Sequence, residues 1–280
     1  MDYLAKEVPR WSRDNHCFSC HNNGDAARAL YAARRLGYTV SAAALADTTR
    51  WLVQPARWDD NHGSPAASDK KLARIQFAAA LAEAFRTGAT HNRRALMAAA
   101  DSLLALQEPD GAWIVDTGGL PGAPATYGST LATYMTRRTL EIAGTKRFRS
   151  AIGRANRWFA AAAPASILDA AAALLALPHS DAIKRKCLPM ILSSQTSDGG
   201  WGPQPHLPAE PFDTAIVLLA LKAAGQTDAA LVTTRARARA FLIAQQDPTG
   251  AWPETTRPGG AQSYAERIST TAWVTCALLE

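Results

Sequence analysis

Apolar residues recur along most of this chain at intervals of three and four positions, the pattern of amphipathic α-helices. The pattern predicts twelve helices in six consecutive pairs, and the second helix of each pair is more continuously apolar than the first. The first members are expected near residues 3–14, 41–55, 90–106, 147–162, 179–195 and 229–246. The second members are expected near residues 25–37, 69–87, 127–143, 167–177, 212–225 and 268–280.

Six apolar helices that need cover on every side are best buried as an inner ring, with the six charged helices around them. We therefore predict an all-α fold, a single (α/α)6 toroid that occupies residues 1–280 as one domain. Glycines able to end a helix in the left-handed conformation follow four second members, at Gly37, Gly88, Gly144 and Gly225. Residues able to cap helix amides stand at or near four second-member starts, at Asp25, Asp69, Asp213 and Ser269.

A seven-residue pattern, Gln-x-x-x-Gly-x-Trp, marks the joint between helices three times, at residues 107–113, 195–201 and 246–252. Each copy follows the charged helix of a pair and precedes a loop to an apolar helix. Repetition of one motif at corresponding positions indicates a repeat architecture.

The three motif copies, together with Pro-Phe-Asp-Thr-Ala at 211–215 and Ile-Ser-Thr-Thr-Ala-Trp at 268–273, resemble squalene-hopene cyclases and related class II terpene cyclases. The resemblance implies the α/α toroid that these enzymes share with protein prenyltransferase β subunits, with the motif's Gln and Trp as structural ties. It also implies an apolar central cavity for a long isoprenoid or another hydrophobic small molecule. Candidate lining residues are Phe77, Tyr134, Leu218, Leu219 and Trp273.

The catalytic motif of class II cyclases, Asp-x-Asp-Asp-Thr-Ala, is matched only in part by residues 210–215. Phe212 stands at the position of the proton donor, so standard proton-initiated cyclisation is not expected. The prenyltransferase zinc site is not matched either, because Ala215 replaces its cysteine and residues 268–273 contain no histidine. Asp213 remains the candidate catalytic residue, with a helix cap as the alternative; Asp25 and Asp169 share this ambiguity. Carboxylates that converge on the lumen would raise one another's pKa values.

The most distinctive chemistry of the chain lies in His16-Cys17-Phe18-Ser19-Cys20-His21, between the first two predicted helices. Cys-x-x-Cys-His is the attachment pattern of c-type haem, in which two thiols bind the vinyl groups and the histidine ligates iron. The sequence therefore predicts haem c at Cys17, Cys20 and His21, with His21 as the metal ligand.

Three other interpretations of this segment stay open. Zinc could be held by Cys17, Cys20, His21 and a fourth ligand such as His16 or Asp25, although no second cysteine pair at zinc-finger spacing is present. The two cysteines could also form a disulfide or redox pair, or remain reduced structural thiols.

A few further residues could bear on a metal or haem. Cys187 and Cys276 are expected to be core thiols. His62 and His206 could reach the mouth of the lumen or supply a distal ligand, and Met135 could be a second axial ligand, but solvated loop histidines and core packing are the simpler interpretations.

The net charge of +6 comes from arginine and lysine scattered over helical segments, which indicates a solvated outer face or peripheral contact with an anionic membrane. Nucleic-acid binding is not expected, since no basic-aromatic or zinc-finger pattern is present. The first 13 residues lack the apolar core of a signal peptide, and no apolar run approaches a membrane span. We expect an exported, periplasmic protein if haem is bound and a cytoplasmic one otherwise.

These observations favour a terpene-cyclase-like toroid that carries a covalent haem c. Its expected role is redox chemistry or electron transfer near a hydrophobic ligand, together with a redox partner. Two alternatives are a terpenoid-processing enzyme that uses a lumen carboxylate such as Asp213, and a non-catalytic ring that binds lipid or protein.

Overall fold

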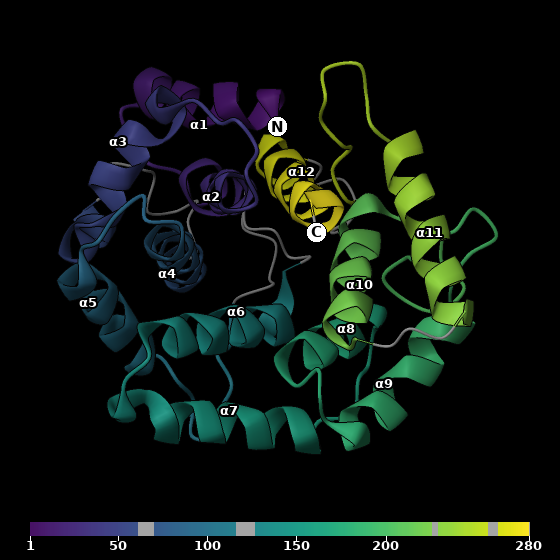
Figure 1. Cartoon of the computed structure of the whole chain (residues 1–280). Coiled ribbons are helices and arrows are strands. Elements are labelled where there is room, and N and C mark those ends of the chain that lie inside the picture. The colour runs from purple at the N-terminus through teal and green to yellow at the C-terminus, as the bar shows by residue number, and fades with distance from the viewer. Residues whose placement is uncertain (61–69, 116–126, 226–228, 257–262, 280) are drawn as a thin grey trace.

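The computed structural model describes residues 1–60, 70–115, 127–225, 229–256 and 263–279. Within these ranges the chain alternates between an outer and an inner layer of helices, which form two concentric rings (Figure 1). The outer helices are α1 (Asp2–Asn15), α3 (Ala42–Leu52), α5 (Arg93–Leu104), α7 (Arg149–Ala161), α9 (Asp181–Ser193) and α11 (Ala229–Ala244). The inner helices are α2 (Ala27–Arg35), α4 (Lys70–Arg86), α6 (Gly128–Ala143), α8 (Ile167–Ala176), α10 (Pro211–Ala223) and α12 (Tyr264–Leu279). The predicted all-α toroid is confirmed.

The inner ring closes because α12, the last inner helix, packs against α10 on one side and against the first inner segment on the other. That first segment comprises α2 and the π-helix that precedes it, η1 (Cys20–Ala26). Since every inner helix is reached through an outer one, the inner helices run in the same direction. Their amino ends therefore share one mouth of the ring and their carboxyl ends share the other.

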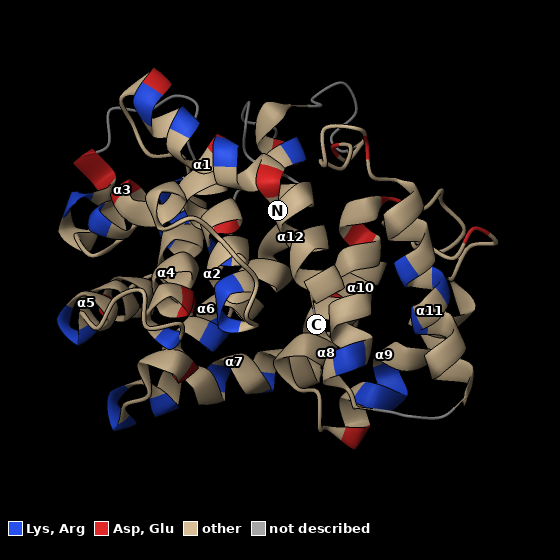
Figure 2. Ribbon diagram, turned by 45° about the horizontal axis from the view of Figure 1, so that its top comes forward, with Lys and Arg blue, Asp and Glu red and all other residues tan. Residues whose placement is uncertain are grey.

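Burial follows the apolar pattern of the sequence. Every residue of α10 from Pro211 to Leu221 is buried, whereas the outer helix α9 buries only four of its residues. Figure 2 shows Lys and Arg spread around the periphery of the ring. None of the helices in the described ranges is both long and apolar enough to span a bilayer.

The repeated Gln-x-x-x-Gly-x-Trp motif ties the two layers together, as the resemblance implied. In each copy the indole Nε1 donates to a carbonyl in the last turn of the preceding outer helix, at Leu103 (2.7 Å), Ile191 (2.7 Å) and Leu242 (2.6 Å). The backbone N–H of each Trp donates to a threonine of the next inner helix, at Thr133, Thr214 and Thr271. The motif is therefore structural.

The motif glycine is required by close packing. Gly199 has φ 96°, and a Cβ there would lie 2.8 Å from the carbonyl oxygen of Arg237 on the neighbouring outer helix α11. Only glycine combines this left-handed backbone with such a close approach. The four glycines predicted to end inner helices also have positive φ, between 65° and 86°.

Two predicted boundaries were wrong. The last inner helix begins at Tyr264 and not near residue 268. The first inner segment begins at Cys20 and not near residue 25, so Cys20 and His21 belong to a helical element and not to a linker. Periodicity could not show this π-helix, because five of its residues are polar or glycine and yet buried, at positions 21–25.

Candidate functional site

A buried polar cluster lies where η1 meets α12, α4 and the start of α6. Its centre is Asp25, which is completely buried. One carboxylate oxygen, Oδ2, accepts hydrogen bonds from Gln76 Nε2 (2.8 Å) and from Ser269 Oγ (2.9 Å). The other, Oδ1, accepts one from the hydroxyl of Tyr127 (3.4 Å). Asp25 is thus held by three donors from three different parts of the ring and does not cap its helix, which was one of the two roles that the sequence left open.

The local sequence explains this placement. Gly24 lets η1 approach α4 closely, since a Cβ at this position would lie 2.9 Å from Gln76 Cβ. This approach brings the amide of Gln76 to Asp25. A π-helical turn is rare and occurs often at functional sites, because the wider turn re-aims the side chains within it.

Burial dominates the electrostatics of the cluster. It raises the pKa of the Asp25 carboxyl, and the nearby Arg28 guanidinium and the three donors oppose that rise. Burial and the Asp25 carboxylate together raise the pKa of the Tyr127 phenol well above its ordinary value. The environment therefore favours the protonated form of both groups.

His21 joins this cluster to the Cys-x-x-Cys-His segment. Its Nδ1 lies 3.4 Å from Ser269 Oγ, and the hydroxyl proton of Ser269 is directed to Asp25. Ser269 Oγ therefore lies between the Asp25 carboxyl and His21 Nδ1, and which of the two groups donates in the His21 contact depends on the tautomer of the imidazole. Nε2 lies 3.5 Å from Cys20 Sγ, on the side of the thiols.

The loop between the two cysteines is held firmly. The ring of Phe18 stacks on Trp51 with 4.6 Å between centroids and 4° between planes. Ser19 caps η1, because its hydroxyl accepts from the backbone N–H groups of His21 (3.1 Å) and Asn22 (3.4 Å). Cys17 and Cys20 are both half-buried and are not joined in a disulfide.

The zinc interpretation finds no assembled ligand set. In the parts of the chain that the structure describes, no three His, Cys, Asp or Glu side chains come together to hold a metal ion. Attachment of c-type haem needs fewer residues from this segment than a zinc site does, namely two thiols and one histidine whose Nδ1 contacts another group. Cys17, Cys20 and His21 supply them, and they are the set of residues that c-type haem attachment uses.

The other candidate residues lie elsewhere. Asp213 is completely buried in the first turn of α10, beside Phe212, whose ring lies edge-on to Trp273 at 6.4 Å. Asp169 is held at the start of α8, where it accepts hydrogen bonds from Thr130 Oγ1 (2.5 Å) and the backbone N–H of Ala165 (3.1 Å). Among the described residues, no hydrogen bond joins Asp169 to the Asp25 cluster.

The remaining predicted residues are dispersed. Cys187 is buried in α9, where burial raises the pKa of its thiol to about 11. His206 is exposed, with a left-handed backbone (φ 69°). His62 and Asp69 lie outside the described residues. Met135 and Cys276 line a cavity in the lumen.

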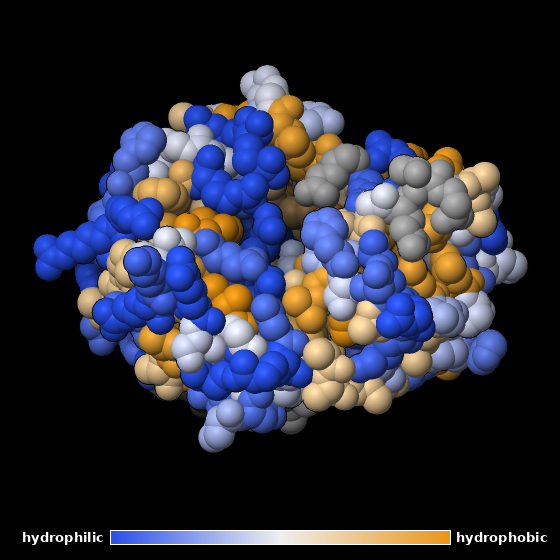
Figure 3. Space-filling view, turned by 60° about the horizontal axis from the view of Figure 1, so that its bottom comes forward, coloured by the Kyte–Doolittle hydropathy of each residue, from blue (hydrophilic) through white to orange (hydrophobic). Residues whose placement is uncertain are grey.

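That cavity has a volume of about 150 Å³ and is lined by all six inner helices. Three of the five predicted lining residues are among its walls, namely Tyr134, Leu219 and Trp273, whereas Phe77 packs against Trp51 and Trp58. The expectation of an apolar cavity needs correction, because Arg28, Arg35 and Arg138 also line it. Figure 3 shows one face of the ring hollowed near its middle, with hydrophilic and apolar side chains around the hollow.

Sequence reasoning missed Gln76, Tyr127 and Arg28 as neighbours of Asp25, and it assigned Ser269 only a capping role. These residues come from distant parts of the chain, so no local spacing joins them. The one local signal was the Gly24-Asp25 pair within a short polar stretch ahead of an apolar helix.

No protein-family model matches the chain, and no curated protein matches its sequence. Among solved structures, the type II terpene cyclase MstE from Scytonema is 17% identical, with a TM-score of 0.41 over 92% of this chain and 86% of that chain. A variant of MstE in complex with its substrate, geranylgeranyl dihydroxybenzoate, is 16% identical with a TM-score of 0.41 over the same shares. The ent-copalyl diphosphate synthase from Streptomyces platensis is 18% identical with a TM-score of 0.40, over 92% of this chain and 50% of that enzyme. At these values, the reaction of this chain must be inferred from its own side chains.

Proposed function

We propose that this ring is a redox protein that carries a covalent c-type haem, bound through thioether bonds to Cys17 and Cys20 and ligated by His21. The observation that carries the proposal is the position of the His21 ring, whose Nδ1 faces Ser269 while Nε2 faces the side of Cys20. A bound haem would supply one-electron transfer, and its attachment implies export from the cytoplasm and a redox partner.

The protein's part in this chemistry is to fix the ligand. Asp25 accepts from Ser269, and Ser269 in turn faces His21 Nδ1, so a buried carboxylate orients the imidazole through one hydroxyl. Partners of this kind set both the orientation and the basicity of a metal-binding histidine. The stacking of Phe18 on Trp51 holds the intervening loop, and with it the spacing of the two thiols.

A hydrophobic ligand has a candidate place at the same mouth of the ring. A groove of about 590 Å³ lies over the amino ends of α6, α8 and α10, and its walls include Gly128, Leu168, Pro203, Leu207 and Pro208. Ser166, Asp169 and Glu210 also line it. Its size and the apolar part of its wall suit an isoprenoid or a similar hydrophobic molecule.

The test is to express the chain with a bacterial export signal and cytochrome c maturation machinery and to record a pyridine haemochrome spectrum. We expect one covalent haem per chain, because both thiols are accessible and the histidine is in place. Cys17→Ala and Cys20→Ala should each lose the two-thioether spectrum, whereas Cys187→Ala, far away in α9, should keep it. A folded protein without covalent haem would refute the proposal.

The Asp25 cluster favours a second candidate, a terpenoid-processing enzyme that uses a lumen carboxylic acid. Desolvation raises the pKa of Asp25 and so favours the protonated state that a general acid requires. Turnover of an isoprenoid that is lost in Asp25→Asn but kept in Asp47→Asn, an exposed residue of α3, would support this candidate. Asp213→Asn tests the residue expected from the sequence in the same assay. Under the haem proposal, Asp25→Asn leaves covalent attachment intact.

A further inference from the structure

Arg28 is a half-buried cation whose guanidinium forms no hydrogen bond to Asp25 among those that hold that carboxylate. Its Nε and Nη2 atoms are shut off from solvent and have no hydrogen-bond partner among the described residues. Its guanidinium lies 4.1 Å from the ring centroid of Trp273, in a cation–π contact. Stacking on an indole stabilises the charge but satisfies none of its N–H groups, which point along the plane of the guanidinium.

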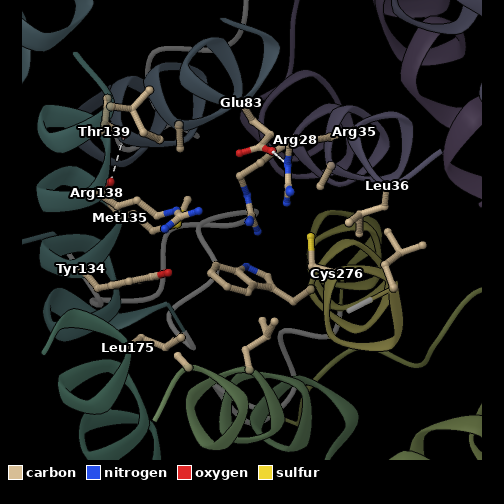
Figure 4. Close-up of a pocket in the computed structure, with 17 residues that line it drawn as sticks. Arg28, Arg35, Leu36, Glu83, Tyr134, Met135, Arg138, Thr139, Leu175 and Cys276 are labelled. Carbon is tan, nitrogen blue, oxygen red and sulfur yellow. Dashed lines mark hydrogen bonds and ion pairs between the residues drawn. The ribbon is translucent and has the colours of Figure 1, made fainter. Parts of the chain in front are cut away.

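Arg28 faces the central cavity together with two further arginines. Figure 4 shows the guanidinium groups of Arg28, Arg35 and Arg138 directed toward the middle of the ring from α2 and α6. Arg28 and Arg35 are seven residues apart, so they lie on the same face of α2 two turns from each other. Arg28 lies at the inner end of the cavity, whereas Arg35 and Arg138 are exposed.

The charge in this cavity is only partly balanced. Glu83 pairs with Arg35 (3.0 Å) and is shared with Arg86 (2.9 Å). Arg138 makes no ion pair among the residues that the structure describes. The carboxylate oxygens of Asp25 accept from Gln76, Ser269 and Tyr127 rather than from Arg28.

A common structural role for such cations does not account for Arg28. Positive side chains near the carboxyl ends of helices often bind the last carbonyls, as Lys222 does with the carbonyl of Ala277 (2.8 Å). Arg28, however, is the second residue of α2. Because the inner helices run in the same direction, Arg28 lies toward their amino ends and away from these last carbonyls.

We propose that the central cavity binds the phosphate or carboxylate headgroup of a small amphiphile, with Arg28 at its inner end and Arg138 at its mouth. The apolar part would lie along the remaining wall, which is formed by Leu36, Ile142, Leu175 and Leu219. A volume of about 150 Å³ accommodates a headgroup and a few methylene groups, and a longer tail would extend past Leu36, which is 40% exposed. The site lies apart from Cys17 and Cys20 and does not depend on haem.

The test is isothermal titration calorimetry of the full chain with octyl phosphate, octanoate and the neutral octanol. We expect both anions to bind at least tenfold more tightly than octanol, since one charge-assisted hydrogen bond supplies about a factor of ten. Arg28→Gln should weaken octyl phosphate at least tenfold, and Arg138→Gln severalfold. Arg94→Gln, an exposed arginine of the outer helix α5, should leave binding unchanged.

Sedimentation with phosphatidylglycerol vesicles separates the two sources of the headgroup. Vesicle binding that Arg28→Gln abolishes would identify a membrane lipid, and binding of monomeric octyl phosphate alone would identify a free amphiphile. Equal affinity for octanol and octyl phosphate, or no binding of either anion, would overturn the proposal. Should Arg28→Gln fail to fold, unchanged binding in the exposed variant Arg138→Gln would also overturn it. The haemochrome assay on the same sample reports separately on the proposed function.

Discussion

At the scale of single residues, the candidate site depends on the lack of a side chain at Gly24 as much as on the polar groups around Asp25. Gly24 has an ordinary helical backbone, so its role is spatial and not conformational. A Cβ there would meet Gln76 Cβ at 2.9 Å and the backbone carbonyl carbon of Gln76 at 3.2 Å. Neither atom is the free end of a flexible side chain, so α4 would have to move away from Asp25.

We therefore expect Gly24→Ala to destabilise the protein by about 1–3 kcal/mol, the usual cost of overpacking a core. Gly153→Ala is the matched control. Gly153 lies inside α7, where a Cβ would meet only the end of Arg157, at 3.7 Å. There alanine should stabilise the helix by about 0.5–1 kcal/mol. Urea unfolding of both variants measures the difference, and equal stabilities would contradict the packing argument.

At the scale of elements, the three motif copies differ in how far their glutamines reach. Gln195 Nε2 donates to the carbonyl of Gly199 (2.8 Å) in its own loop and to that of Thr234 (2.9 Å) in the next outer helix, α11. Gln107 makes the equivalent bridge from α5 to α7. The side-chain amide of Gln246 donates to the carbonyl of Gly250 (3.1 Å) within its own loop, and Gln246 is exposed.

This difference predicts unequal effects from the same substitution. Gln195→Ala should lower the free energy of unfolding by about 1–3 kcal/mol, since it removes the hydrogen bonds to the Gly199 and Thr234 carbonyls and the side-chain oxygen that accepts from Arg237. Gln246→Ala should cost less than about 1 kcal/mol, because water can replace its single exposed bond. Thermal and urea unfolding would compare the two variants. A larger loss from Gln246→Ala would show that the bridge between outer helices contributes little.

Helix number and order could be predicted from the sequence because apolar spacing reports burial, and burial decides which helices lie inside. The π-helix η1 could not be predicted this way. Most of its buried residues are polar, and several bind partners remote in the sequence, as Asn22 does with Tyr264 and Asn23 with Thr48. The Asp25 cluster could not be predicted for the same reason, because its members lie on four separate segments of the chain. Cys17, Cys20 and His21 could be singled out because haem attachment depends on local spacing.

At the scale of the whole molecule, the ring is closed by contacts between its first and last helices. The hydroxyl of Tyr264 donates to Glu7 Oε2 (2.6 Å) and accepts from Asn22 Nδ2 (2.7 Å). The same ring stacks on Trp11 at 5.5 Å. One side chain at the start of α12 thus joins α1 and η1, across almost the full length of the chain.

Because ring closure is non-local, Tyr264→Phe should shift unfolding of the whole ring and not only of its ends. We expect a loss of about 1–3 kcal/mol, since the Glu7 carboxylate and the Asn22 amide both lose a partner. Circular dichroism and tryptophan fluorescence should report the same shifted midpoint. Tyr38→Phe, at an exposed position, should leave the midpoint within about 0.5 kcal/mol of the parent. Different midpoints for the two probes would show that the contact of α12 with α1 and η1 unfolds separately from the rest of the ring.

Arg28 lines the cavity and also interacts electrostatically with Asp25, so the cavity and the Asp25 cluster share one positive charge. An anion held by Arg28 would weaken the field that favours the ionised form of Asp25, and the protein would take up a proton together with the anion. Linkage is reciprocal, so affinity for the anion would fall as rising pH removes that proton. Asp25 also bonds Ser269, which contacts His21, so an anion bound in the cavity would change the electrostatic environment of the imidazole.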